Sequence, residues 1–212
     1  MMKLLFQGDS ITDCGRDKSS DFEPDRSPGA HLGAGYPLLI ASRLLADQPF
    51  GSLSVANLGV GGNRIVDLAA RAQEHVWNLQ PTHLSILIGV NDTWHTFKRC
   101  AGVDLARFER VYRNLLIDTQ HRVEGVRFIL CEPFVLPCGV VTPDWTGDID
   151  QRRAIVQNLA TEFDAVFVAF QSVFHAALDR APAEFWAPDG VHPSPAGHRL
   201  MADEWMRQVS LP

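Results

Sequence analysis

The stretch Leu4-Leu5-Phe6-Gln7-Gly8-Asp9-Ser10-Ile11 places polar residues directly after a short apolar run. A short apolar run bounded by glycine is typical of a buried strand, so we predict a first strand over Leu4 to Gln7. In parallel α/β sheets, ligands bind beyond the carboxyl ends of the strands. Ser10 follows this predicted strand and is therefore a candidate functional residue.

The alternation of short apolar runs and helical patterns continues along the chain. Further strands are predicted over 53–57, 84–88, 126–131 and 165–168, and helices over 38–46, 65–79, 105–123, 149–163 and 195–209. Strands separated by helices predict an α/β fold, a five-stranded parallel sheet covered on both faces in a three-layer α/β/α sandwich. No domain boundary is evident, which favours a single domain over 1–212. A Gly-, Asp-, Ser- and Pro-rich loop over 13–37 is predicted to be functional.

Composition and charge exclude several classes of partner. The net charge is −6 and no Lys/Arg cluster is longer than a pair, which argues against nucleic acid. No stretch approaches the roughly 20 apolar residues of a membrane span. The N-terminal apolar run is too short for a signal-peptide core, so a cytoplasmic location is predicted. Four cysteines without C-x-x-C spacing favour free thiols in a reducing compartment, with a Cys131–Cys138 bridge as the open alternative.

The residue types that follow the predicted strands fit acyl transfer. A serine hydroxyl is a poor nucleophile until a base takes its proton, and a carboxylate must orient that base. Asp189 and His192 are three residues apart, so one loop can present both to Ser10. The backbone N–H groups of Ser10 and Gly62 and the amide of Asn91 are candidate donors for the developing oxyanion. No cofactor or metal is required.

Each of these residues also has a purely structural interpretation. Ser10 can cap a helix, and Asp9 can hold the turn that follows the strand. Gly61-Gly62 can be a tight turn with positive φ, and Asn91-Asp92 can begin a helix. The combination, at successive strand ends, favours the catalytic interpretation.

Four segments together resemble the four sequence blocks of the SGNH/GDSL hydrolase family: Gly8-Asp9-Ser10-Ile11, Gly62, Gly89-Val90-Asn91-Asp92 and Asp189-Gly190-Val191-His192. The resemblance implies a flavodoxin-like fold and the triad and oxyanion roles given above. The G-x-S-x-G elbow of the α/β-hydrolases is absent. Within the family the chain is most similar to bacterial acetyl xylan esterases that act inside the cell on xylo-oligosaccharides. It departs from them before the acid, where Ala187-Pro188 stand and the expected tryptophan sits earlier, at Trp186.

Several neighbouring residues are candidates for substrate binding: Asp9, Arg64, Trp94 and Trp186. The alternatives are core packing for the two tryptophans and a surface ion pair for Arg64. His31 is a candidate for reaching the pocket, whereas His198 is interpreted as a cap or core residue. The resemblance makes a homo-oligomer plausible, and three aromatic residues are interface candidates, with core packing as the alternative: Phe97, Phe108 and Trp205.

The leading functional hypothesis is a serine carboxylic ester hydrolase that removes acetyl groups from a small acylated carbohydrate. A thioesterase or lysophospholipase with the same triad is an alternative, as is a non-catalytic carbohydrate-binding protein on the same fold. A further alternative is metal-dependent phosphoester hydrolysis, with Asp9, Asp92, Asp189 and His192 as ligands.

Overall fold

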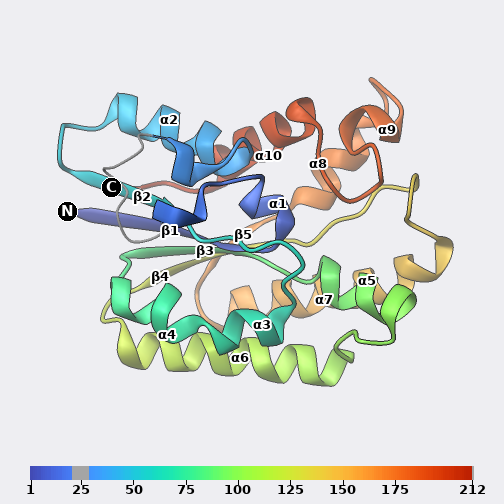
Figure 1. Ribbon diagram of the computed structural model, residues 1–212, viewed down its shortest axis with the longest axis horizontal. Helices are drawn as coiled ribbons and strands as arrows, with labels where there is room; N and C mark the ends of the chain where they lie inside the picture. The colour runs from blue at the N-terminus through green and yellow to red at the C-terminus, as the bar shows by residue number, and fades with distance from the viewer. Residues whose placement is uncertain (21–28, 212) are drawn as a thin grey trace.

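A five-stranded parallel sheet forms the centre of the molecule, which we describe from a computed structural model over residues 1–20 and 29–211 (Figure 1). The strands are β1 (Met2–Gly8), β2 (Leu53–Asn57), β3 (His83–Leu87), β4 (Arg127–Cys131) and β5 (Val166–Val168). Their order, β2-β1-β3-β4-β5, is that of flavodoxin-like folds. The predicted fold class and all five predicted strands are confirmed.

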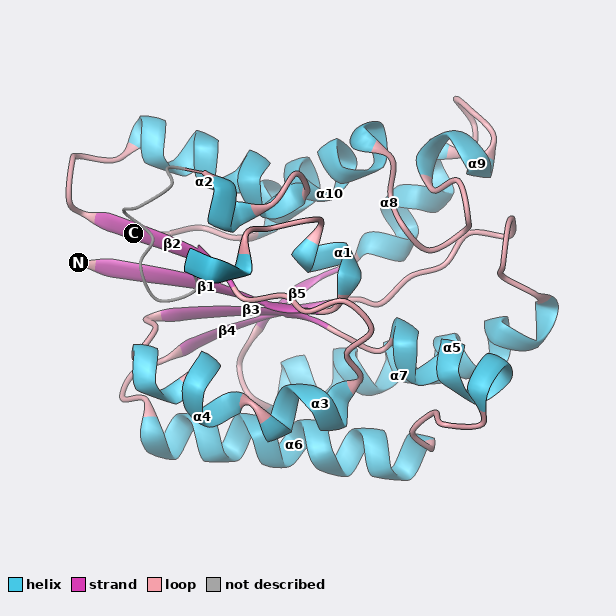
Figure 2. Ribbon diagram, in the orientation of Figure 1, coloured by secondary structure: helices cyan, strands magenta, loops and turns pink. Residues whose placement is uncertain are grey.

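Helices cover both faces of the sheet (Figure 2). One face carries α2 (Tyr36–Asp47), α8 (Phe170–Ala177) and α10 (Pro195–Gln208). The opposite face carries α3 (Ile65–Ala70), α4 (Ala72–His75), α6 (Leu105–Arg122) and α7 (Pro143–Glu162). Three short helices stand toward the carboxyl ends of the strands: α1 (Ser10–Asp13), α5 (Val90–Arg99) and α9 (Ala183–Trp186).

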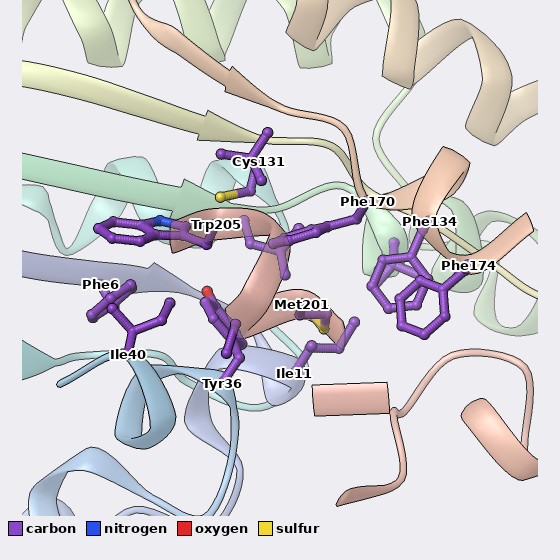
Figure 3. Packing of buried hydrophobic residues seen from close by; sticks show 14 of the residues in the cluster. Phe6, Ile11, Tyr36, Ile40, Cys131, Phe134, Phe170, Phe174, Met201 and Trp205 are labelled. Atoms are coloured by element: carbon purple, nitrogen blue, oxygen red, sulfur yellow. The ribbon is translucent and has the colours of Figure 1, made fainter. Parts of the chain in front are cut away.

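Burial of both faces explains why the strands are almost continuously apolar. Successive side chains of a strand point to opposite faces, so Leu4 and Phe6 join one core cluster and Leu5 joins the other. The first cluster lies between the sheet and α2, α8 and α10, and it is rich in aromatic rings (Figure 3). Within it the rings of Phe134 and Phe174 stack with centroids 4.3 Å apart. Two separate cores therefore hold the sheet from its two sides.

The observed burial and cysteine states test several predictions about single residues. Phe108 and Trp205 are fully buried, so they pack in the core instead of forming an interface. Phe97 is 43% exposed and stacks against Trp145. All four cysteines are free, which excludes the Cys131–Cys138 bridge in this structure.

The predicted helix over 65–79 is wrong as a continuous element. The chain leaves the helical conformation at Arg71 and continues as α4 and a 3₁₀ turn over Trp77–Leu79. The guanidinium of Arg71 donates to the backbone oxygens of Leu58 (2.8 Å) and Gly8 (3.2 Å), so it joins this break to the ends of β2 and β1. Apolar spacing does not report such tertiary hydrogen bonds.

Other elements differ from the sequence-based expectation at their boundaries. Helix α7 begins at Pro143, six residues before the predicted start at Ile149, because proline is well suited to a first helical turn. Helix α5 corresponds to the interpretation of Asn91-Asp92 as a helix start. Of the predicted loop over 13–37, residues 21–28 lie outside the described residues, and Ala30–Leu32 forms a 3₁₀ turn. Among the described residues, no helix combines the length and apolar character needed to cross a bilayer.

Candidate active site

Ser10 is held at the carboxyl end of β1 by the first turn of α1. Asp9 caps this helix, and its Oδ1 accepts a hydrogen bond from the Ile11 N–H at 3.0 Å. Gly8 allows the close approach of β1 to its surroundings, because a Cβ there would lie 2.5 Å from the Leu87 carbonyl oxygen and 2.3 Å from Thr12 Oγ1. The backbone that precedes Ser10 is therefore closely packed, and it fixes the position of the serine.

The loop after β2 lies beside Ser10. A Cβ on Gly61 would be 3.8 Å from Ser10 Cβ, and the Gly61 N–H donates to Asp13 Oδ2 at 3.0 Å. Gly62 has φ of +81°, a left-handed conformation that glycine adopts without strain, which confirms the tight-turn interpretation of Gly61-Gly62. This turn leaves Gly62 exposed, directly after Gly61, which lies beside the serine.

Asn91 enters the same region from the first turn of α5. Its Nδ2 donates to the Asn63 carbonyl oxygen at 3.2 Å, so one of the two amide hydrogens is engaged and the other is available. The neighbouring Asp92 is fully buried, and both of its carboxylate oxygens lie 3.2 Å from the Ile65 N–H. The glycine loop and α5 are thereby joined to each other by hydrogen bonds.

Asp189 and His192 occupy one turn, as their spacing predicted. Asp189 Oδ1 accepts from the backbone N–H groups of Val191 (2.9 Å) and His192 (2.7 Å). Its Oδ2 lies 2.6 Å from His192 Nδ1. Although partial burial disfavours the charge, the hydrogen bonds from His192 and Val191 hold the pKa of the Asp189 carboxyl below its usual value. An ionised carboxylate only accepts, so His192 Nδ1 donates and Nε2 is left as the acceptor.

The structure brings Ser10 to this acceptor. Ser10 Oγ lies 2.8 Å from His192 Nε2, although the two residues are 182 positions apart in the chain. The hydroxyl, imidazole and carboxylate form a continuous chain of hydrogen bonds. Such an arrangement can transfer a proton from the hydroxyl to the ring while the carboxylate stabilises the imidazolium.

Trp94 flanks the histidine. Its ring centroid is 5.9 Å from that of His192 and 5.5 Å from that of Trp145. Trp145 is fully buried and Trp94 only partly, so Trp94 rests on the core and borders the site. Trp94, one of the four residues predicted to bind substrate, is therefore placed where it can contact a substrate.

The other three substrate-binding candidates have different surroundings. Asp9 is fully buried beneath the turn, and burial raises its pKa to about 7. Trp186 is 6% exposed, and its indole N–H contacts the backbone oxygens of Ala177 and Ala181. Arg64 forms an ion pair with Asp67 at 2.9 Å, which corresponds to the surface interpretation. These contacts place Asp9 and Trp186 in the framework of the site and not on its open surface.

The two further histidines near the site are buried. His198 accepts a hydrogen bond at Nδ1 from the Tyr36 N–H at 3.2 Å, and its Nε2 lies 3.4 Å from Cys14 Sγ. Burial lowers the pKa of His198 to about 4, so His198 stays neutral and serves as the predicted core residue. His31 is also buried, with Nε2 at 3.3 Å from the Val55 oxygen of β2.

The four residues of the alternative metal-binding hypothesis do not converge. Asp9 and Asp92 are buried and bind backbone N–H groups, whereas Asp189 and His192 bind each other. Over residues 1–20 and 29–211, no three His, Cys, Asp or Glu side chains are grouped as ligands for a metal ion.

Two residues that shape the site were missed by sequence reasoning. Asp13 accepts from the Gly61 N–H, and Asn57 donates to the Thr12 oxygen at 2.6 Å while accepting from the Gly59 N–H at 2.9 Å. A signal was present for Asn57, since a polar residue that ends a buried strand needs hydrogen-bond partners. Gly59 is only two residues away, but Thr12 lies in α1 after another strand, and this second partner cannot be read from the spacing.

A parallel α/β fold with a serine hydrogen-bonded to a histidine–aspartate pair is typical of hydrolases that act through a serine nucleophile. The chain belongs to the GDSL-like lipase/acylhydrolase family, whose model matches residues 6–200. The family resemblance found in the sequence is thus confirmed, and the protein is a serine carboxylic ester hydrolase.

Individual relatives resemble almost the whole chain. An acetylxylan esterase of Geobacillus stearothermophilus is 37% identical over 98% of this chain and 93% of its own length. A crystal structure of that organism's acetylxylan esterase superposes with a TM-score of 0.87 at 35% identity, covering 100% of this chain and 95% of the other. A structure described as a GDSL-like lipase, from Parabacteroides merdae, has a TM-score of 0.90 at 40% identity and covers 98% and 94%.

Proposed function

We propose that Ser10, His192 and Asp189 are the catalytic triad of this esterase. The chain of hydrogen bonds from Ser10 Oγ through His192 to Asp189 is the observation that carries this proposal. Ser10 Oγ attacks the acyl carbon while His192 Nε2 accepts its proton. His192 then protonates the leaving alcohol, and a water molecule repeats the sequence to release the acid.

The tetrahedral intermediate is stabilised by three donors in this proposal: the backbone N–H groups of Ser10 and Gly62 and the amide of Asn91. The open position of Gly62, directly after the Gly61 that lies beside Ser10, and the available hydrogen on Asn91 Nδ2 support these roles. Donors aimed at the developing charge typically each account for about 10²–10³ in kcat.

The substrate class in this proposal is an acetylated xylo-oligosaccharide or a related acetylated carbohydrate. The similarity to the Geobacillus acetylxylan esterase, whose structures are also described as those of an acetyl-xylooligosaccharide esterase, supports this class. Trp94 gives a physical reason for this substrate class, because its aromatic face beside His192 can pack against a sugar ring or limit the size of the acyl group.

Three further parts of the proposal concern the setting of the enzyme. Residues 1–212 act as one domain, supported by the match of the family model to residues 6–200. The enzyme works in the reducing cytoplasm, supported by four free thiols. It forms a homo-oligomer, for which the exposed rings of Phe97 and Phe185 are contact candidates.

Acetate release tests the proposed chemistry and substrate together. The wild type should release acetate from peracetylated xylose and from p-nitrophenyl acetate. Ser10→Ala should lower kcat by about 10⁴-fold or more for both esters, because the nucleophile is lost. If Ser10→Ala keeps most of its activity, the proposed triad is wrong. If the wild type cleaves only the nitrophenyl ester, the proposed carbohydrate substrate is wrong.

A further inference from the structure

A cavity of about 410 Å³ opens beyond the carboxyl ends of β4 and β5. Its polar wall comes from α7 and α8 and includes Asp150, Arg153, Gln171 and His175. Its apolar wall comes from the segment between β4 and α7 and includes Val135, Pro137 and Val141. Neither Ser10, Asp189 nor His192 lines it, so the cavity is distinct from the proposed reaction centre.

The segment 135–141 separates this cavity from the turn that carries Asp189. The Leu136 N–H donates to the Gly190 oxygen at 2.8 Å, and the Val140 N–H donates to the Asp189 oxygen at 2.9 Å. The two backbones are in close contact, since a Cβ on Gly139 would lie 2.4 Å from Asp189 Cα. A ligand in the cavity would therefore touch the outer side of this segment and not the catalytic groups.

Gln171 organises the floor of the cavity. It is 4% exposed, and its Oε1 accepts from the Val135 N–H and from Arg153 Nη1, both at 3.1 Å. Its Nε2 donates to the Val135 oxygen (3.0 Å) and lies 2.8 Å from His175 Nε2. An amide nitrogen only donates, so His175 Nε2 accepts, and the neutral ring carries its hydrogen on Nδ1. That N–H is a donor at the exposed edge of the cavity.

The two charged side chains that line the cavity, Asp150 and Arg153, compensate each other. The guanidinium of Arg153 lies 2.7 Å from Asp150 Oδ1 and 3.5 Å from Glu132 Oε1. An anion would have to compete with these carboxylates, and a cation would meet the guanidinium. Each of the three guanidinium nitrogens of Arg153 thus lies within 3.5 Å of an oxygen of Glu132, Asp150 or Gln171. The cavity thus offers directional hydrogen bonds without a net charge that selects an ion.

We propose that this cavity is a second saccharide-binding site. A pyranose ring has apolar C–H faces and a rim of hydroxyl groups. The apolar faces of the ring can pack against the wall formed by Val135, Pro137 and Val141. The hydroxyl groups can form hydrogen bonds with the side chains of Asp150 and His175. The volume lies within the roughly 300–1,000 Å³ typical of small-molecule sites. The choice of a xylo-oligosaccharide as occupant rests on the proposed function.

Binding of xylotriose, which carries no ester and is not turned over, tests the proposal. Calorimetric titration of the wild type should show saturable binding, and the side-chain amide resonances of Gln171 should shift in NMR spectra. Thr146→Trp places a large ring on the exposed rim of the cavity and should weaken binding at least tenfold. Gln151→Trp, on the neighbouring exposed face of α7, is the matched control and should bind as the wild type does.

The outcomes separate this proposal from the proposed function. Thr146→Trp should keep its rate on p-nitrophenyl acetate within about twofold, because residue 146 contacts no group of the proposed triad. If this variant fails to fold, His175→Ala replaces it and should weaken binding at least threefold. Absence of xylotriose binding, or equal binding in both tryptophan variants, overturns the cavity site. If Thr146→Trp weakens xylotriose binding but the wild type does not hydrolyse acetylated xylose, the cavity site is supported and the proposed substrate is wrong.

Discussion

Around Ser10 the side chains that shape the backbone are buried, whereas the turn of Asp189 and His192 stands near solvent. Asp9 and Asn57 are 0% and 1% exposed, and both bind backbone groups inside the protein. The side chains of Asp189 and His192 are 35% and 43% exposed, and they are held mainly by hydrogen bonds within their own turn. The bond from Ser10 Oγ to His192 Nε2 joins the two regions.

This difference indicates how each region responds to mutation. Ser10, the proposed nucleophile, is positioned by close packing and buried polar contacts, so changes around it should reduce stability. The side chains of Asp189 and His192, the proposed acid and base, are oriented by hydrogen bonds near solvent, while backbone bonds from Leu136 and Val140 hold the turn itself. Changes to these two side chains should therefore reduce the rate with little effect on stability. Four substitutions test this division, from the largest expected effect to the smallest.

Asp189→Asn should lower kcat by about 10⁴-fold at neutral pH, because an amide neither fixes the histidine tautomer nor stabilises the imidazolium. The free energy of unfolding should change by less than about 1 kcal/mol, since the asparagine Oδ1 can still accept from the Val191 and His192 N–H groups. Steady-state kinetics and urea unfolding measure the two quantities. Asp203→Asn, which alters an exposed carboxylate on α10, is the control. A large loss of stability in Asp189→Asn would contradict the division.

Asp92→Asn should change how stability depends on pH. Burial raises the pKa of Asp92 from its usual value of 3.8 to about 7 in the folded protein. The folded state therefore holds the proton more tightly, and this contribution to stability is lost as pH rises from about 4 to about 7. The neutral asparagine lacks that titration.

The free energy of unfolding of the wild type, minus that of Asp92→Asn, should therefore fall by up to about 4 kcal/mol over this pH range. Urea unfolding at about pH 4.5 and about pH 7.5 measures this change. Asp9, whose pKa is raised in the same direction, is present in both proteins and cancels to first order. A difference that does not vary with pH would show that Asp92 does not titrate in this range.

Gly8→Ala should destabilise the protein by about 1–3 kcal/mol, the range typical of overpacking. The new Cβ would meet the Leu87 carbonyl oxygen at 2.5 Å, and this backbone oxygen belongs to a central strand. Thermal or urea unfolding measures the loss. Gly147→Ala on α7 is the matched control, since its Cβ meets nothing within 4 Å and should stabilise the helix. Equal effects at both positions would mean that the end of β1 beneath Ser10 is not tightly packed.

Ser194→Ala should lower the free energy of unfolding by about 1 kcal/mol, as expected for a helix N-cap. Ser194 accepts from the Gly197 N–H at 3.2 Å and begins α10 directly after the acid–base turn. Ser42→Ala, an exposed hydroxyl within α2, should cause no loss. Urea unfolding of both variants gives the comparison. A tenfold drop in kcat for Ser194→Ala would show that the cap also positions His192.

Local patterns in the sequence determined the strands, the longer helices and the polar residues at the strand ends. Leu4 to Gln7 and Leu84 to Ile88 are predictable as strands because burial on both faces demands continuous apolar runs. The Asp189–His192 turn is predictable because its hydrogen bonds span only three residues. The helix cap at Ser194 is local in the same way, because its hydroxyl accepts from the N–H of Gly197, three residues on.

Only the tertiary structure decided which of the candidate residues border His192 and which are buried beneath the site. Asp9 and Trp186 are as close to the motifs in sequence as Trp94 is, yet the first two are buried and the third borders His192. The break at Arg71 depends, in the same way, on contacts with distant strand ends. Burial and hydrogen bonding between remote segments depend on how the layers pack, and no spacing along the chain encodes that packing.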